Sequence, residues 1–385
     1  MLELLFLLLP IAAAYGWFMG RNSVRAEQRK EQEQFSQKYV TGINLLLSDQ
    51  SDKAVDLFVD ILDVDSETLD THWALGKLFR RRGEVERAIR IHQNLISRPS
   101  LADHDRHQAL FELGEDYLSA GLYDRAENMF SDLQNQPRFR EPSLYNLIAI
   151  YESTHEWHKA IKVALKISRT DKSVEPTVAQ FYCELADLQE DAETSLKYYE
   201  KALKHDRSCV RAALALGRWW LGQARYKKAL GYLTLVKDQD IDFVSEALPL
   251  IRDAYHAMGD TQSFAAYLHE CLQIYPSASV VNMLADLIAE QNHVEEAENF
   301  LTQALAENPT AKGFHKLIQL HVREAEQGRA RESLVMLQKM VAERLKLNAK
   351  YHCRHCGFAT QTLYWHCPSC KAWAAIKPSK GLDGE

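Results

Sequence analysis

The sequence lacks the local motifs of the common catalytic sites. It contains no phosphate-cradling glycine loop, no nucleophile elbow and no His-Glu-x-x-His metalloprotease helix. It also lacks an excess of positive charge, since 46 Lys and Arg stand against 53 Asp and Glu for a net charge of −7. The chain as a whole therefore offers no general attraction to nucleic acid. These absences favour a binding protein over an enzyme.

Cysteines are few and unevenly placed. The chain has 7 of them, and four lie close together near the C-terminus: Cys353, Cys356, Cys367 and Cys370. A disulfide framework would spread its cysteines over a small secreted chain. The cluster instead indicates a metal site in a reducing compartment. Of the scattered cysteines, Cys183 and Cys271 are expected in the hydrophobic core, and no role is assigned to Cys209.

A long apolar run stands at the N-terminus, where residues 2–19 read LELLFLLLPIAAAYGWFM. About 20 apolar residues span a bilayer as a helix. No Lys or Arg precedes the run, as a signal peptide would require, whereas Arg21 and Arg25 follow it. Because basic residues stay on the cytoplasmic side, we expect residues 1–20 to be a single-pass anchor with the N-terminus outside. The alternative is a signal peptide cleaved near Ala12–Ala14.

A polar juxtamembrane helix is expected over residues 21–34, and a period close to 34 residues begins after it. The clearest units place a glycine on one predicted helix and an alanine on the next: Gly76 with Ala88, Gly114 with Ala126, and Gly217 with Ala229. A large residue stands one helical turn beyond each alanine. The pattern resembles the tetratricopeptide repeat. It predicts about nine units over residues 35–345, with an insertion near residues 99–105.

The repeat predicts an all-α fold, a tetratricopeptide-repeat superhelix. Small residues let the two helices of each hairpin cross closely where the glycine meets the alanine, and stacked hairpins share one continuous core. An unrelated all-α solenoid is the alternative, with the same function class. Repeat arrays present concave surfaces to other proteins. Five first-helix residues are candidates for partner binding there: Trp73, Lys77, Arg80, Phe111 and Arg218.

The C-terminal segment, residues 346–385, carries two Cys-x-x-Cys pairs. Two such pairs can close a tetrahedral four-sulfur metal site, and Gly357 and Pro368 suit the tight turns. The ligands do not separate zinc from iron. The pairs resemble rubredoxin knuckles, although Lys371 replaces the usual glycine, which argues against independent electron transfer. Three neighbouring histidines are expected to be solvated and not ligands: His352, His355 and His366.

The residues around the knuckles are aromatic and basic. A module of about 30 residues needs its metal to fold, and its aromatic residues should form its core or pack on the last repeat: Tyr351, Phe358, Tyr364, Trp365 and Trp373. Residues 346–380 contain six basic residues and no acid: Lys346, Lys350, Arg354, Lys371, Lys377 and Lys380. This balance predicts contact with an acidic partner. Nucleic acid is not expected beside a membrane anchor and an acidic array.

The order of anchor, repeats and knuckles resembles the lipopolysaccharide assembly protein B family. The resemblance covers the whole chain and is most specific in the opening MLELLFLLLPIAAAYGWFMGR and the closing LYWHCPSCKAW. It implies a non-enzymatic adaptor on the cytoplasmic face of the inner membrane, with Cys353, Cys356, Cys367 and Cys370 as metal ligands and iron as the favoured metal. Family members favour the degradation of the deacetylase that commits precursors to lipid A, by a membrane-bound ATP-dependent metalloprotease.

Two other functions fit the same features. The chain could be a scaffold that gathers lipopolysaccharide synthesis or transport proteins without proteolysis. It could instead be an electron-transfer protein that uses a rubredoxin-like iron. A scaffold, unlike the adaptor, would leave the lifetime of the deacetylase unchanged. An electron-transfer protein would lose its function when zinc replaces iron.

Overall fold

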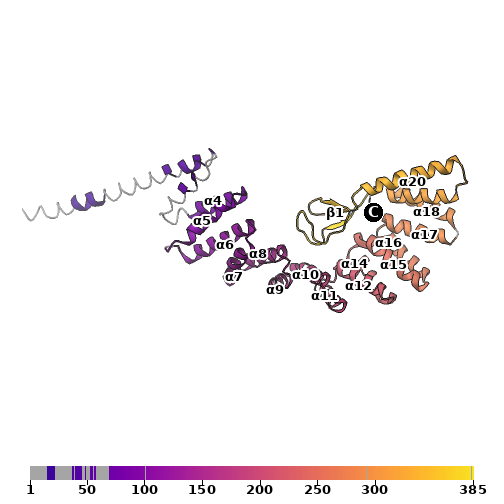
Figure 1. The fold of residues 1–385 in the computed structure, drawn as a ribbon, viewed down its shortest axis with the longest axis horizontal. Helices are drawn as coiled ribbons and strands as arrows, with labels where there is room; N and C mark the ends of the chain where they lie inside the picture. The colour runs from indigo at the N-terminus through magenta and orange to yellow at the C-terminus, as the bar shows by residue number, and fades with distance from the viewer. Residues whose placement is uncertain are drawn as a thin grey trace, which may run out of the picture. The chain divides into compact units, whose positions relative to one another are not determined.

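The computed structural model describes residues 15–21, 37–38, 40–45, 48, 53–54, 56–57, 69–99, 101–291, 293–382 and 384–385. The chain divides into two compact units, Met1–Thr154 and His155–Glu385, each treated by itself below (Figure 1). Most of the predicted anchor and juxtamembrane helix lies outside the described residues, although residues 15–21 are helical. In the described part of the chain, no helix is both long and apolar enough to cross a membrane.

The described repeats of the first unit are built from the helices α4 (Leu69–Arg81), α5 (Val85–Ile96), α6 (Asp103–Ser119), α7 (Tyr123–Leu133) and α8 (Arg140–Ser153). They consist of two antiparallel helix pairs, α4 with α5 and α6 with α7, followed by the single helix α8. The turns inside the first two pairs contain Gly83 at φ 81° and Gly121 at φ 72°. Glycine is suited to these left-handed positions because it has no Cβ. The insertion expected near residues 99–105 falls at the connection between α5 and α6.

The second unit continues the helical pairs and ends in a small strand module. Its helices are α9 (Trp157–Ile167), η3 (Lys172–Val174), α10 (Glu175–Asp187), α11 (Ala192–His205), α12 (Val210–Gly222), α13 (Tyr226–Leu233), α14 (Val236–Gln239), η4 (Ile241–Phe243), α15 (Val244–Met258), α16 (Thr261–Ile274), α17 (Ala278–Glu290), α18 (Val294–Glu307), α19 (Ala311–Glu324) and α20 (Arg329–Leu347). The tetratricopeptide-repeat prediction is confirmed for these residues. The count of nine units stays a prediction, since residues 58–68 are not described.

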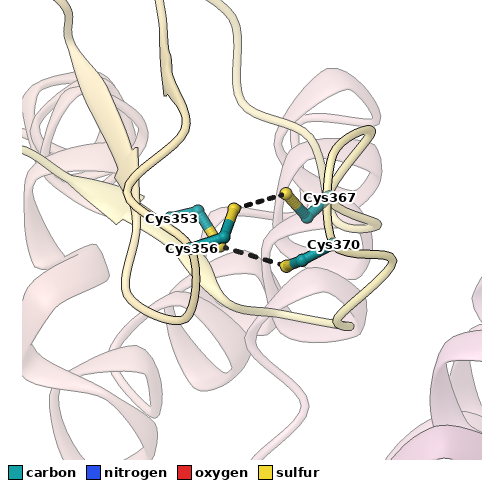
Figure 2. A group of neighbouring side chains, drawn as sticks. All are labelled: Cys353, Cys356, Cys367 and Cys370. Carbon is teal, nitrogen blue, oxygen red and sulfur yellow. Dashed lines mark hydrogen bonds between the residues drawn. The ribbon is translucent and has the colours of Figure 1, made fainter.

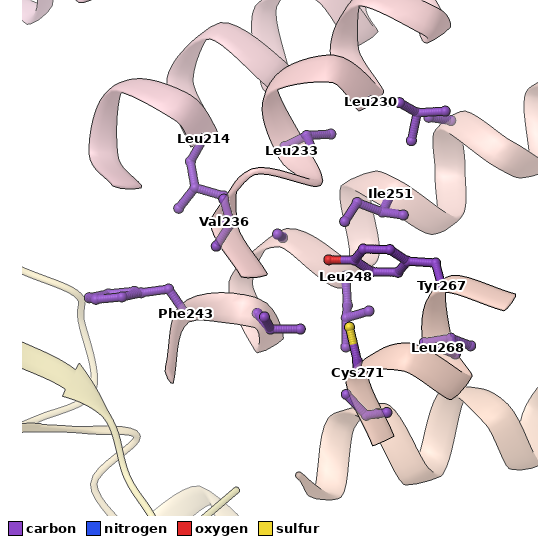
Figure 3. Packing of buried hydrophobic residues seen from close by; sticks show 14 of the residues in the cluster. Leu214, Leu230, Leu233, Val236, Phe243, Leu248, Ile251, Tyr267, Leu268 and Cys271 are labelled. Atoms are coloured by element: carbon purple, nitrogen blue, oxygen red, sulfur yellow. The ribbon is translucent and has the colours of Figure 1, made fainter. Parts of the chain in front are cut away.

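A continuous hydrophobic core runs through the middle of this unit. Figure 3 shows side chains from successive helices pointing into one cluster, among them Leu233 of α13, Leu248 of α15 and Leu268 of α16. All three are fully buried. Leu363 and Trp365 of the C-terminal module pack against the same cluster. The repeats and the module therefore share apolar surface, which ties their stabilities together.

Each of the three repeat glycines packs against a large side chain from the second helix of its pair. A Cβ atom built on Gly76 would lie 2.5 Å from His92, and one on Gly114 would lie 2.8 Å from Phe130. A Cβ atom on Gly217 would overlap Leu233 in the same way. We expected these glycines to meet the alanines of the second helix. The nearest atoms belong instead to the large residue one turn beyond each alanine, which fills the groove that the glycine leaves open.

The Gly217→Ala substitution is expected to destabilise the second unit. Its new methyl group would overlap the buried side chain of Leu233, and overpacking of this kind costs about 1–3 kcal/mol. The matched control is Gly222→Ala in the same helix, where nothing lies within 4 Å of the added Cβ. Urea unfolding followed by circular dichroism would compare the two. Equal midpoints for both variants would contradict the packing described here.

The C-terminal module is built on a three-stranded antiparallel sheet. Its strands are β1 (Tyr351–Cys353), β2 (Ala359–Thr360) and β3 (Ile376–Pro378), in the order β2-β1-β3. Cys353 pairs with Ile376, and both are buried. The all-α label therefore holds for the described repeats and needs correction for this module, because the two knuckles are held together by short strands.

Candidate metal centre and its docking surface

Each Cys-x-x-Cys pair forms a tight knuckle. The backbone carbonyl of Cys353 accepts a hydrogen bond from Gly357 at 3.0 Å, and that of Cys367 accepts one from Lys371 at 2.9 Å. Gly357 has φ 78° and Lys371 has φ 59°, so the two residues hold equivalent left-handed positions. The second knuckle thus keeps the rubredoxin-like turn even though a lysine replaces glycine.

The four sulfur atoms converge on one point, as Figure 2 shows. The Sγ atoms of Cys353 and Cys370 are 3.7 Å apart, and those of Cys356 and Cys367 are also 3.7 Å apart. All four lie within 4.8 Å of one another. A tetrahedral ion with metal–sulfur bonds of about 2.3 Å needs sulfur atoms about 3.8 Å apart. The four predicted ligands therefore fit a single metal ion, and this ligand set accepts zinc or iron.

The first knuckle also favours the charge state that binds metal. A hydrogen bond from the backbone N–H of Phe358 lowers the pKa of Cys356. In the same cluster, although a hydrogen bond from the backbone N–H of Ala372 opposes it, burial and the sulfur neighbours raise the pKa of Cys370. The thiolate is the form that ligates a metal, so the backbone of the first knuckle favours the ligating form of Cys356.

The neighbouring histidines are not among the converging ligand atoms. His352 is exposed, and its Nδ1 lies 2.7 Å from the Oγ of Ser379, while His355 is exposed as expected. The prediction of a solvated ring is wrong for His366. That ring is half-buried and stacks on Trp373 with centroids 4.2 Å apart, because the second knuckle faces the repeats.

Two tryptophans of the module pack on the middle of the second unit. Trp365 stacks on Phe243 with centroids 5.3 Å apart and an interplanar angle of 25°. Trp373 meets Trp157 at 6.1 Å and Phe181 at 5.8 Å, both edge to face. We expected packing on the last repeat or within the module. The contacts lie instead on α9, α10 and η4, because the chain folds back after α20.

The basic side chains of the module meet two aspartates of the repeat array. Lys377 lies 2.7 Å from Asp240, and Lys380 lies 2.6 Å from Asp242. Arg354 lies 3.8 Å from Asp242. The hydroxyl of Tyr351 also donates to Glu246 at 2.7 Å. The positive charge of the module predicted an acidic partner. For Lys377, Lys380 and Arg354, that partner is the repeat array of the same chain.

A second set of polar contacts, which was not predicted from the sequence, holds Glu385 against the repeats. The carboxylate of Glu385 accepts hydrogen bonds from the backbone N–H and the hydroxyl of Ser279, at 2.9 and 2.8 Å. Lys312 pairs with the same carboxylate at 2.5 Å. Ser279 is in the first turn of α17, where the helix dipole favours a negative charge. Nothing local in the sequence pointed to this contact, because its partners are far apart along the chain.

The predicted partner-binding residues of the first unit take part in internal contacts. Trp73 packs beside Leu95 and Ala109, and Phe111 lies 5.6 Å from Phe130, centroid to centroid. Arg80 pairs with the buried Glu112 and Asp116, at 2.8 and 2.6 Å, and Lys77 pairs with Glu112 at 2.9 Å. Although burial opposes it, hydrogen bonds from Arg80 and Lys77 lower the pKa of Glu112. In the second unit, Arg218 is exposed. Partner binding by these five residues stays a prediction.

The scattered cysteines are buried in the repeats. Cys183 and Cys271 are fully buried, which confirms them as core residues. Cys209, to which no role was assigned, is also buried, and its Sγ lies 3.8 Å from that of Cys183. Burial raises the pKa of Cys183. This thiol is therefore protonated, as in an ordinary core cysteine.

Comparison with known proteins agrees with the geometry. Residues 351–378 match a family described as a rubredoxin metal binding domain, and residues 72–103 and 186–242 match tetratricopeptide repeats. The chain is 46% identical to Lipopolysaccharide assembly protein B of Escherichia coli K12, covering 100% of both chains. It is 39% identical to the protein of that name from Haemophilus influenzae, covering 98% of both.

Solved structures match this chain at a lower level of similarity. A tetratricopeptide repeat protein from Parabacteroides merdae is 14% identical, with a TM-score of 0.33, and the match covers 72% of this chain and 100% of that one. The repeat assignment rests on the matched families and on the helix boundaries.

Proposed function

The chain belongs to the lipopolysaccharide assembly protein B family, and we propose that it is an adaptor that regulates lipid A synthesis by promoting proteolysis of the committed-step deacetylase. The protease in this proposal is a membrane-bound ATP-dependent metalloprotease. The repeat array supplies the binding surface for these proteins, as repeat arrays commonly do. The chain itself performs no chemistry in this role.

The observation that carries the proposal is the docking of the metal module on the repeats. Trp365 and Trp373 pack on aromatic residues of the array, and Asp240 and Asp242 pair with basic residues of the module. One metal ion bound by four cysteines would hold the two knuckles in the shape that these contacts need. The metal would thus act through the shape of a protein-binding surface. We propose iron as the native ion, which metal analysis of the purified protein would test.

The site of action in this proposal is the inner membrane. Residues 1–20 would form a single-pass anchor with the N-terminus outside, which leaves the repeats and the module in the cytoplasm. Confinement to the membrane raises the effective concentration of the chain near membrane-bound partners. Weak contacts then suffice for regulation. Fractionation of cells that carry the chain with and without residues 1–20 would test this location.

The lifetime of the deacetylase tests the function directly. In cells that lack the chain, we expect the deacetylase to persist several-fold longer than in cells that carry it. The variant in which Cys353 and Cys356 are both serine should behave like the absence of the chain. A deacetylase lifetime that does not depend on the chain, together with disturbed lipopolysaccharide assembly, would support a scaffold instead.

A further inference from the structure

Two residues near the second knuckle adopt a backbone conformation that favours glycine. Lys371 has φ 59° and Ala374 has φ 50°, whereas the position in the first knuckle that matches Lys371 is occupied by Gly357. A side chain in this region costs about 1–2 kcal/mol. Glycine at position 371 would avoid that cost. The chain therefore places an ammonium group here at the expense of stability, which is a pattern found at functional sites.

Both strained residues line a cavity of about 290 Å³ inside the second unit. One wall comes from the module and includes Trp365 and Trp373. The opposite wall comes from α10, the turn before α12 and η4, and includes Gln180 and Phe243. The cavity thus lies between the metal module and the repeats, and aromatic rings supply part of both walls.

The array side of the cavity holds a buried amide with an unsatisfied atom. Gln180 is only 4% exposed, and its Nε2 donates to the Sγ of Cys209 at 3.7 Å. Its Oε1 has no hydrogen-bond partner in the described part of the protein. If the two amide atoms exchange places, the sulfur can still donate to the oxygen, and the NH₂ group is then unsatisfied. A buried amide atom without a partner costs about 1–3 kcal/mol, which a ligand could relieve.

The charges around the cavity decide which ligand it suits. Asp240 is already paired with Lys377 at 2.7 Å. Asp206 keeps its charge, and one of its oxygens accepts a hydrogen bond from the backbone N–H of Ser208 at 2.9 Å. No carboxylate among the described residues pairs with Lys371, which leaves its charge available. The cavity therefore offers one cation, one buried amide and one carboxylate that can accept hydrogen bonds, beside the rings of the two tryptophans. A peptide segment with one acidic side chain suits this set, because its carboxylate can pair with Lys371 and its backbone N–H groups can donate to the amide and carboxylate oxygens.

We propose that this cavity binds a short acidic peptide segment of a partner protein. A carboxylate of the segment pairs with Lys371, a backbone amide bonds to Gln180, and an apolar side chain packs against Trp365 and Trp373. This proposal rests on the adaptor function and gives it a peptide-binding site. The cavity has walls from both the module and the repeat array, so it exists only while the module is docked. Docking of the module would thus create the peptide-binding site.

Peptide binding to the purified full-length chain tests the proposal. The probes are labelled, acetylated pentapeptides with a central glutamate between varied apolar residues, each matched with a central glutamine. Fluorescence anisotropy should show about tenfold tighter binding of the best glutamate peptide than of its glutamine match, as expected for one charge-assisted hydrogen bond. The Lys371→Gly variant should lose this preference although its knuckle is less strained, and Lys371→Arg should keep it.

A variant on the array wall separates the cavity from the metal site. Gln180→Leu should weaken binding of both members of a peptide pair by about tenfold, because it removes a hydrogen-bonding amide, while the glutamate preference remains. Metal content and the circular dichroism spectrum should match the unmodified chain in every variant. If no glutamate peptide is preferred, or if Lys371→Gly keeps the preference, the proposal is wrong.

The two proposals can fail separately. The peptide assay contains neither the deacetylase nor the protease. Intact peptide binding with an unchanged deacetylase lifetime would overturn only the adaptor function. Loss of peptide binding with normal regulation of the deacetylase would overturn only the assignment of this cavity.

Discussion

Replacing both Cys353 and Cys356 with serine is expected to abolish metal binding and to release the C-terminal module from the repeats. In the unmodified chain, four cysteine sulfur atoms within 4.8 Å of one another can bind one metal ion. The variant keeps two of these ligands and has two neutral hydroxyls in place of the others, so it should bind the ion far more weakly. Structural four-ligand sites contribute roughly 10 kcal/mol or more of apparent binding energy. Within the module, the regular structure that remains without the ion is a sheet of three short strands, so the docking contacts would lose the shape that positions them. Metal analysis and limited proteolysis would measure the two losses.

The helical array should survive this change. The strands of the module account for little of the regular structure, so the far-ultraviolet circular dichroism of the double variant should stay close to that of the unmodified chain. Cys271→Ala is the matched control, because it removes a buried cysteine outside the metal site. That variant should retain its metal and its protease resistance. A double serine variant whose module resists proteolysis as well as the control does would refute the role given to the ion.

The features that could be predicted from the sequence are the ones encoded locally. The metal ligands follow from two Cys-x-x-Cys pairs, whose spacing fixes which sulfur atoms can share one ion. The paired helices follow from a repeat in which Gly76, Gly114 and Gly217 recur with regular partners. Even here, the residue that fills each glycine position was misassigned. Spacing identifies a helix face, but it does not decide which side chain of that face reaches the groove.

The docking of the module could not be predicted, because its contacts join residues that are distant in the chain. The hydroxyl of Tyr351 reaches Glu246, and the carboxylate of Glu385 reaches Ser279. The excess of basic residues in the module predicted contact with acidic groups. Composition alone could not show that Asp240 and Asp242 are those groups. The predicted anchor lies mostly outside the described residues, so its place in a membrane stays a prediction.

The Asp242→Lys substitution is expected to detach the module while leaving its metal in place. Asp242 is 11% exposed and faces Lys380 at 2.6 Å, Lys377 at 3.7 Å and Arg354 at 3.8 Å. A lysine there would replace three attractions by three repulsions in a partly desolvated contact. Losing one partner of such a pair costs about 2–5 kcal/mol, so we expect the equilibrium constant for docking to fall by roughly 30-fold or more. Hydrogen exchange in η4 and β3 would report the detachment.

This variant separates the role of the metal from the role of docking. If the ion acts only by shaping a docked module, Asp242→Lys should keep its full metal content and still lengthen the lifetime of the deacetylase, as the double serine variant does. Asp253→Lys on α15 is the matched control, because its carboxylate pairs with Arg252 and not with the module. Lys380→Asp added to Asp242→Lys should restore docking in part, because it exchanges one pair of charges while Lys377 and Arg354 still face the new lysine. Normal regulation by a chain with a detached module would show that the metal site acts by itself.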